Sequence, residues 1–265
     1  MNDMENICLD PTDASEMHEK DHVFFTHLTT ELIHLLPVLP EKCTAFTTQE
    51  IYKLLQKLNR YCGLGLDFPK NLKILPYDYP LNLKNLCVTA KASDDGWFGA
   101  CVLLLEDENE KIGYAKRFVA HGLHKKRIKK WKQFFRDQSL SALILGKDLV
   151  ENKDSLLPDF KKIAKELENL EEGAAVSTNF SLYDPESLTK LNDLCQKTGH
   201  RLLLTPLQAN IAKSFFPFDD FETGTDSDVL IADLRQTFDV VCETQSPSEI
   251  DDLIKIIDPK EVSYC

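Results

Sequence analysis

The sequence has few glycines and lacks the short motifs that cradle phosphate groups. Only 10 of its 265 residues are glycine. It contains no Gly-x-Gly-x-x-Gly run, no Walker-type Gly-Lys-Ser/Thr loop and no Gly-x-Ser-x-Gly nucleophile elbow. These absences argue against a nucleotide-dependent enzyme, and we expect no cofactor.

Long apolar runs are also missing. No run approaches the ~20 residues that span a bilayer, and the N-terminus lacks the basic-then-apolar pattern of a signal peptide. The eight cysteines are scattered singly, without a Cys-x-x-Cys pair, so neither a zinc ribbon nor a thioredoxin-type motif is supported. We therefore predict a cytoplasmic or nuclear protein with free thiols and no membrane span.

The charge of the chain is acidic, with one basic exception. The formal net charge is -12, yet residues 116–137 hold nine Lys or Arg against a single Asp, so the rest carries about -20. A body this negative repels nucleic acid over long range. Binding to nucleic acid is therefore expected only at the local basic segment.

The basic segment, residues 122–136, is predicted to be an amphipathic helix. Ile128, Trp131 and Phe135 fall on one helical face and basic residues cover the remainder. One interpretation is a crossover helix that packs on a sheet with its lysines in water. The other is a binding patch or a nuclear-localisation run. The residues predicted to bind a partner are Lys125, Lys126, Arg127, Lys129, Lys130, Trp131 and Lys132.

The N-terminal half reads as helices followed by antiparallel strands. Residues 1–15 are expected to form a flexible acidic tail, and the apolar spacing over 15–36 predicts a helix. The Pro-rich stretch 63–80 is expected to be a loop. Strands are predicted at 86–90 and 100–105, and the second continues through a charged tip into a β-hairpin.

The C-terminal half alternates apolar runs with capped amphipathic helices. This pattern predicts an α/β portion with a mainly parallel, Rossmann-like sheet. The expected domains are 16–120 and 121–265, either separate or joined as one continuous domain. The predicted strands are 142–145, 174–177, 201–205 and 239–243, and the predicted helices are 156–170, 185–198, 207–216, 228–238 and 247–257.

Residues 18–22 read His-Glu-Lys-Asp-His, which resembles the His-Glu-x-x-His motif of zinc peptidases of the thermolysin and aminopeptidase type. The resemblance implies that His18 and His22 bind zinc from one helix face, with Glu41 as third ligand. Those families prefer uncharged residues where this sequence has Lys and Asp, and Glu41 follows a proline in a loop. The alternative is an exposed helix start without a metal.

Polar residues follow the predicted C-terminal strands, where ligands gather in open parallel sheets. Lys147 is a candidate for holding an anion, and Asp148 or Glu243 for acting as a base. Helix capping is the competing explanation, because the same residue types begin helices. The candidate ligand-binding residues are Gly146, Asn179, Thr205, Gln208 and Thr244.

Two functional hypotheses remain, and the sequence leaves open whether the protein is an enzyme. The first is a non-catalytic interaction or regulatory protein that binds a protein partner, with the basic helix among its contacts. The second is a hydrolase or transferase that uses the strand-end residues, with a zinc hydrolase as a further variant. The first is favoured mainly because nucleophile elbows and phosphate loops are missing.

Overall fold

The structure is a computed structural model that describes residues 3–119, 123–147, 157–158, 160–169, 184–224, 242–243 and 247–265. The chain divides into two compact units. The boundary expected near residue 120 falls inside unit 1, because β9 (Ala142–Leu145) pairs with the strand that precedes that boundary. Unit 1 comprises Met1–Leu55, Gly65–Asp154 and Gln245–Cys265, and unit 2 comprises Gln56–Leu64 and Ser155–Thr244.

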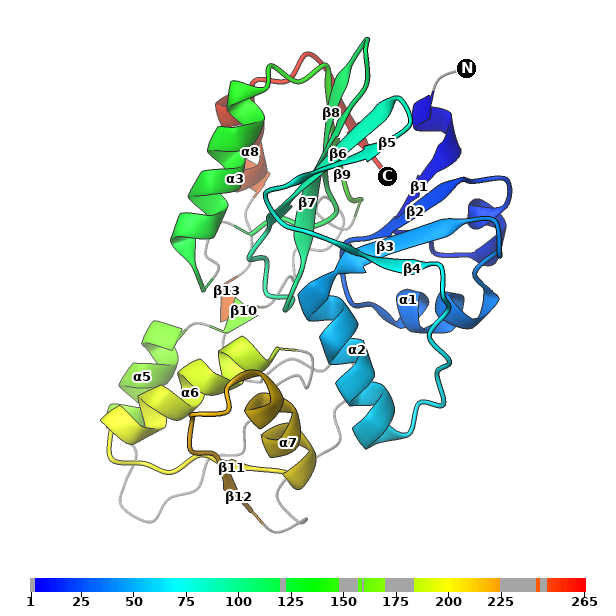
Figure 1. Cartoon of the computed structure of the whole chain (residues 1–265). Helices are drawn as coiled ribbons and strands as arrows, with labels where there is room; N and C mark the ends of the chain where they lie inside the picture. Colours follow the sequence, from blue (N-terminus) through cyan, green and yellow to red (C-terminus); the bar gives the residue numbers. More distant parts are fainter. Residues whose placement is uncertain are drawn as a thin grey trace. The chain divides into compact units, whose positions relative to one another are not determined.

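Unit 1 begins with a sheet of four parallel strands, here called sheet A (Figure 1). Its order is β1-β2-β3-β4, so the carboxyl ends of all four strands lie at one edge. The elements of this part of the chain are η1 (Asp3–Asn6), β1 (Ile7–Leu9), η2 (Ala14–Met17), β2 (His22–Phe25), α1 (Thr30–Leu35), η3 (Leu36–Val38), β3 (Thr44–Thr48), α2 (Gln49–Cys62) and β4 (Leu72–Leu75). The division into units falls within α2, whose residues from Gln56 onward belong to unit 2.

Sheet A overturns the prediction of one helix over residues 15–36. Val23, Phe24 and Phe25 are consecutive and all buried, as expected for a strand covered on both faces. The spacing of apolar residues here also fits a helix, so periodicity alone did not separate the two. The stretch predicted as a loop, 63–80, contains β4, and the predicted tail contains β1.

The second sheet of unit 1, sheet B, has six strands in the order β14-β9-β8-β7-β6-β5. β5 to β8 are antiparallel neighbours, whereas β8, β9 and β14 are parallel. The predicted hairpin is confirmed, with Leu105 opposite Ile112. The strands are β5 (Pro80–Leu83), β6 (Leu86–Ala92), β7 (Cys101–Glu106), β8 (Lys111–Ala115), β9 and β14 (Val262–Tyr264).

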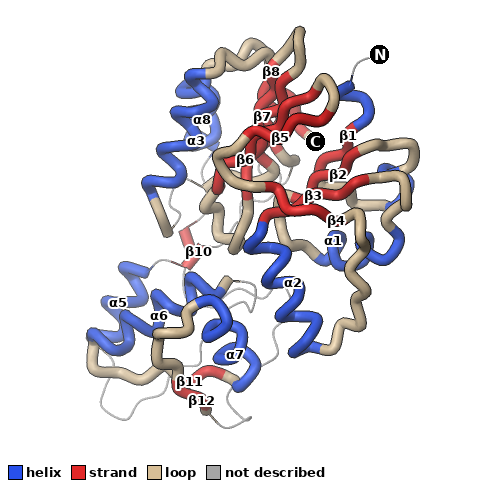
Figure 2. Tube along the Cα trace, in the orientation of Figure 1, coloured by secondary structure: helices blue, strands red, loops and turns tan. Residues whose placement is uncertain are grey.

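Sheet B is covered on both faces. The predicted helices α3 (Lys125–Asp137) and α8 (Pro247–Ile257) are confirmed, and they contact each other (Figure 2). Val102 and Leu104 of β7 belong to the core beneath them, whereas Leu103 packs with Phe24 of sheet A. Successive side chains of a strand point to opposite faces, so the continuous apolar run of β7 separates two cores.

The described residues of unit 2 include three of the predicted helices and four short strands. β11 pairs with β12 in parallel, and β10 pairs with β13 antiparallel. Leu188 and Leu191 of α6 pack with Ile163 and Phe221 in one core. The elements are β10 (Leu157–Pro158), α5 (Phe160–Glu168), α6 (Pro185–Lys197), β11 (Leu203–Leu204), α7 (Pro206–Phe215), β12 (Glu222–Thr223) and β13 (Cys242–Glu243).

The chain therefore has a mixed α/β fold, with a parallel four-stranded sheet and a mixed six-stranded sheet. The described strands do not form the single, mainly parallel C-terminal sheet that we predicted. β9, β11 and β13 belong to three different sheets, because an apolar run predicts a buried strand without specifying its partner. The predicted strand 174–177 and helix 228–238 lie outside the described residues. No helix in the described ranges has the length and apolarity needed to cross a membrane.

Candidate functional site

Buried polar residues gather at the carboxyl edge of sheet A. Asp10 follows β1, and Thr26 and His27 follow β2. The loop 93–100 after β6 reaches the same place, because the backbone N–H of Cys101 donates to the carbonyl of Thr26 at 3.1 Å. The sequence predicts ligand-binding residues at strand ends of the C-terminal half, whereas the four-stranded parallel sheet lies in the N-terminal half.

His27 lies at the centre of this network. Its Nε2 is 2.7 Å from Oδ2 of Asp95, and its Nδ1 is 2.7 Å from the hydroxyl of Thr26. The hydroxyl of Ser93 donates to the same Asp95 oxygen at 3.0 Å. The exposed fractions of His27 and Asp95 are 1% and 3%. The distances fit a nucleophile–base–orienter arrangement, so the proton positions decide what the network can do.

The directions of the hydrogen bonds around His27 follow from the single hydroxyl proton of Thr26. The single hydroxyl proton of Thr26 goes to Oδ2 of Asp10, so this hydroxyl accepts from Nδ1–H of His27. The other ring nitrogen faces the Asp95 carboxylate, which only accepts. Both ring nitrogens of His27 are therefore engaged in hydrogen bonds within the network. In this arrangement the Thr26 proton is directed to Asp10 and not to His27.

The ionisation of the neighbouring groups agrees with this assignment. Burial alone would raise the pKa of Asp95, but the charge and hydrogen bond of His27, the charge of Arg117 and the hydroxyl of Ser93 outweigh it and lower that pKa. Burial and the Asp10 carboxylate raise the pKa of Tyr114. The Tyr114 phenol therefore keeps its proton, which it donates to Oδ2 of Asp10 at 2.9 Å.

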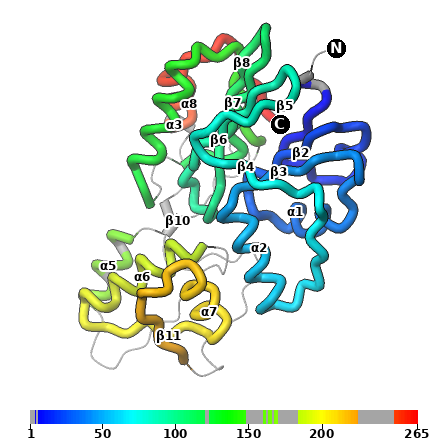
Figure 3. Tube along the Cα trace, in the orientation of Figure 1, coloured from blue at the N-terminus to red at the C-terminus, as the bar shows by residue number. Residues whose placement is uncertain are grey.

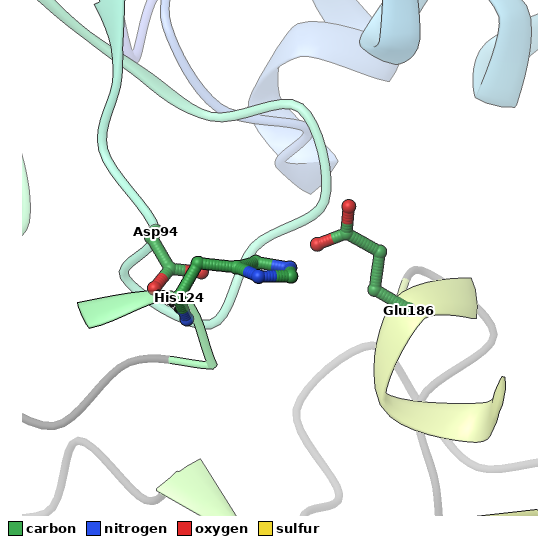
Figure 4. A group of neighbouring side chains, drawn as sticks. All are labelled: Asp94, His124 and Glu186. Atoms are coloured by element: carbon green, nitrogen blue, oxygen red, sulfur yellow. Dashed lines mark hydrogen bonds between the residues drawn. The ribbon is translucent and has the colours of Figure 1, made fainter. Parts of the chain in front are cut away.

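The loop 93–100 also holds α3 in place. The indole N–H of Trp131 donates to the carbonyl of Ser93 at 3.1 Å. The carboxylate of Asp94 accepts from the backbone N–H of His124, the residue before α3, and Figure 4 draws both. Glu186, drawn with them, is a residue of α6 in unit 2. The buried network and the basic helix are thus linked through one short loop.

The exposed side of α3 is basic. Ile128, Trp131 and Phe135 are buried on sheet B, so the crossover-helix interpretation holds for the apolar stripe. Trp131 was predicted to contact a partner, but it is only 1% exposed and belongs to the core. We define the basic face of α3 as the four exposed residues Lys125, Lys126, Lys129 and Lys130. None of the four makes an ion pair with another described residue.

Arg127 and Lys132, also predicted to bind a partner, are only partly exposed. The Lys132 ammonium lies 5.7 Å from the ring centroid of Phe118.

The predicted strand-end residues are spread over the two units. Gly146 and Lys147 follow β9 in unit 1, and a Cβ on Gly146 would lie 2.2 Å from the carbonyl oxygen of Lys116. Thr205 and Gln208, in unit 2, form the capping box of α7, as the capping explanation expects. Glu243 is in β13 of unit 2, and Asp148, Asn179 and Thr244 lie outside the described residues.

The zinc motif is not on a helix. His18 ends the short 3-10 helix η2, and His22 begins β2. The shared helix face that the resemblance to zinc peptidases requires is therefore not formed. Glu41 is exposed in the turn before β3.

The network residues that sequence reasoning missed are Asp10, Thr26, Ser93, Asp95 and Tyr114. A polar pair directly after the apolar run 23–25 was the available signal, but that run was assigned to a helix.

Comparisons with known proteins bear on the fold of this chain. No family model matches the chain, and no curated protein matches it. The chain is similar to the crystal structure of a protein of unknown function from Enterococcus faecalis V583, with a TM-score of 0.58 and 17% identity. The alignment covers 92% of this chain and 57% of that one, so this chain spans little more than half of its length. At this identity the similarity shows a shared fold alone.

A second match is the crystal structure of the metallo-beta-lactamase fold protein YhfI from Bacillus subtilis. Its TM-score is 0.37 at 13% identity, over 52% of this chain and 57% of that one. A score this low carries no argument about this protein.

Proposed function

We propose that this chain is a non-catalytic binding protein that engages an acidic protein partner through the basic face of α3. The observation that carries the proposal is the exposure of four lysines without ion pairs to described residues, on a chain of net charge -12. The buried network supports the non-catalytic part, because both ring nitrogens of His27 are already used.

The spacing of the lysines suits a partner with clustered carboxylates. Lys125 and Lys129, like Lys126 and Lys130, are four residues apart and lie about 6 Å apart along the axis. Like charges at this spacing destabilise a helix by a few tenths of a kcal/mol for each pair. Carboxylates from a partner remove this repulsion, which favours the bound state. The stripe buried on sheet B keeps the helix folded when no partner is bound.

Charge reversal on the basic face tests the proposal. Proteins captured on wild-type chain from its native cell are compared with those captured on the double variant Lys126→Glu/Lys130→Glu. The control is Lys53→Glu/Lys213→Glu, which changes the net charge equally at exposed lysines of α2 and α7. We expect one acidic protein to be lost with the first variant and kept with the control.

Direct binding of that protein is then measured by calorimetry at increasing salt. The affinity should fall with salt, because exposed charges are screened. Equal capture by the two double variants contradicts the proposal. If no protein partner is captured but RNA or DNA is retained through Lys126 and Lys130, the proposed protein binding is wrong and the basic face binds nucleic acid.

A further inference from the structure

The most exposed large apolar side chain among the described residues is Phe218, in the turn after α7 of unit 2. Its exposed fraction is 99%. Single exposed apolar residues are common on protein surfaces and need no explanation by themselves. Phe218 differs because the chain on both sides of it is fixed and because two aspartates follow it in the sequence.

A tight turn presents Phe218 to solvent. The backbone N–H of Asp219 donates to the carbonyl of Phe216 at 3.2 Å, with Pro217 and Phe218 between them. Proline in the first central position fixes φ for such a turn. Phe216 packs on the core of unit 2. The backbone at Phe218 is therefore held in place, with the side chain in solvent.

The chain after the turn is anchored as well. The side-chain amide of Asn192 donates to the carbonyl of Asp220 at 2.9 Å, and Phe221 is buried in the core. An aromatic residue on an ordered backbone loses less conformational entropy on binding than one on a flexible chain, and aromatic residues are frequent hot spots. Phe218 thus has the properties of a binding anchor, and we call residues 217–220 the Phe218 turn.

The residues of the Phe218 turn favour binding to a cationic surface. Lysine ammonium groups are attracted both to carboxylates and to the face of an aromatic ring. This protein uses lysine–phenylalanine contacts elsewhere, with Lys91 over Phe134 and Lys190 over Phe160, each 4.3 Å from the ring centroid. The exposed carboxylate of Asp220 adds charge to the same contact.

We infer that the Phe218 turn of one copy docks on the basic face of α3 of a second copy. This inference rests on the proposed function and names its acidic partner as the chain itself, whose net charge is -12. The basic face supplies lysine ammonium groups, and the turn supplies the exposed carboxylate of Asp220 and the aromatic ring of Phe218, to which ammonium groups are attracted. The contact joins different surfaces, so each copy offers one of each.

Sedimentation velocity over a wide range of protein concentration tests the inference. Wild-type chain should associate at low salt and dissociate at high salt. Phe218→Ser should raise the dissociation constant about tenfold or more, as expected for an aromatic anchor. Tyr79→Ser, which removes another exposed aromatic residue, is the matched control and should associate like wild type.

Complementation makes the test specific. Phe218→Ser retains the basic face and Lys126→Glu/Lys130→Glu retains the turn, so neither should self-associate, yet their mixture should form a pair. A mixture that stays monomeric, or a wild-type chain that is monomeric at every concentration, overturns the inference. If the inference is overturned but Lys126→Glu/Lys130→Glu fails to capture a different protein that the wild-type chain captures, the proposed function stands without the inference. If that variant self-associates and captures protein like wild type, both fail.

Discussion

His27 joins two buried carboxylates into one hydrogen-bonded chain at the carboxyl edge of sheet A. Withdrawing such charges from water is costly, and only their mutual attraction and complete hydrogen bonding offset the cost. Removing one partner leaves the others buried and uncompensated. At the scale of single residues, substitutions in this network should therefore lower the free energy of unfolding strongly.

The variant Asp95→Ala should lower the free energy of unfolding by about 3–5 kcal/mol, the range for breaking a buried pair. Its control is Asp21→Ala, which removes an exposed pair with Lys84 and should cost about 0–1 kcal/mol. Urea denaturation followed by tryptophan fluorescence measures both. Equal, small losses would show that Asp95 and His27 do not form a buried ion pair.

The lowered pKa of Asp95 predicts a loss of stability in acid. Its pKa in the folded chain is below the unfolded value of about 3.9. The stabilisation is therefore complete above that value and is lost as the pH falls through the folded pKa.

Urea midpoints at decreasing pH should fall more steeply for wild type than for Asp95→Asn, which has no charge to lose. Parallel curves for the two proteins would contradict the assignment.

At the scale of elements, the loop 93–100 is fitted against the start of α2. Gly99 has φ +78°, and a Cβ there would lie 2.7 Å from Cβ of Glu50 and 2.9 Å from the backbone nitrogen of Ile51. The hydroxyls of Thr48 and Tyr77 both donate to its carbonyl at 2.7 Å. Any shift of this loop would disturb both of these hydrogen bonds.

Gly99→Ala should therefore destabilise unit 1 by about 2–4 kcal/mol, combining a left-handed backbone with overpacking. Gly65→Ala isolates the first cause, because Gly65, also in unit 1, has φ +65° and open space around it. About 1 kcal/mol is expected there. Thermal unfolding of both variants measures the difference. Similar losses would mean that the loop can move away from α2.

The helices with caps and clear apolar stripes were predictable, whereas the pairing of strands was not. α3, α6 and α8 follow from local spacing and from caps such as Asp184, whose side chain accepts from Ser187 N–H. β2 was mistaken for a helix because an apolar run this short fits both periods.

The buried network could not be predicted from the sequence, for a related reason. His27 and Asp95 are 68 residues apart in sequence, and only the meeting of sheets A and B brings them together. The basic face of α3 was predictable, because it depends on one helix alone.

At the scale of the whole molecule, the two units have separate cores. Leu188 is fully buried in unit 2, and Leu253 is fully buried in unit 1. Both tryptophans of the chain, Trp97 and Trp131, belong to unit 1. Tryptophan fluorescence therefore reports on unit 1, whereas far-ultraviolet circular dichroism reports on the helices of both units.

Leu188→Ala should lose about 2–5 kcal/mol within unit 2. It should add an early transition by circular dichroism and leave the fluorescence midpoint unchanged. Leu253→Ala, the counterpart in unit 1, should lower the fluorescence midpoint. A fluorescence midpoint that moves in both variants would mean that the units unfold as one.

The sequence order of unit 1 has a consequence for synthesis on the ribosome. α8 and β14 return to sheet B only after the residues of unit 2 (Figure 3). Ile128, Trp131 and Phe135 share a core with Leu253 and Ile257 of α8. While unit 2 is being translated, the part of this core that Leu253 and Ile257 later cover stays exposed. Chaperones that bind exposed apolar segments should bind the nascent chain at that stage and release it once α8 has been synthesised.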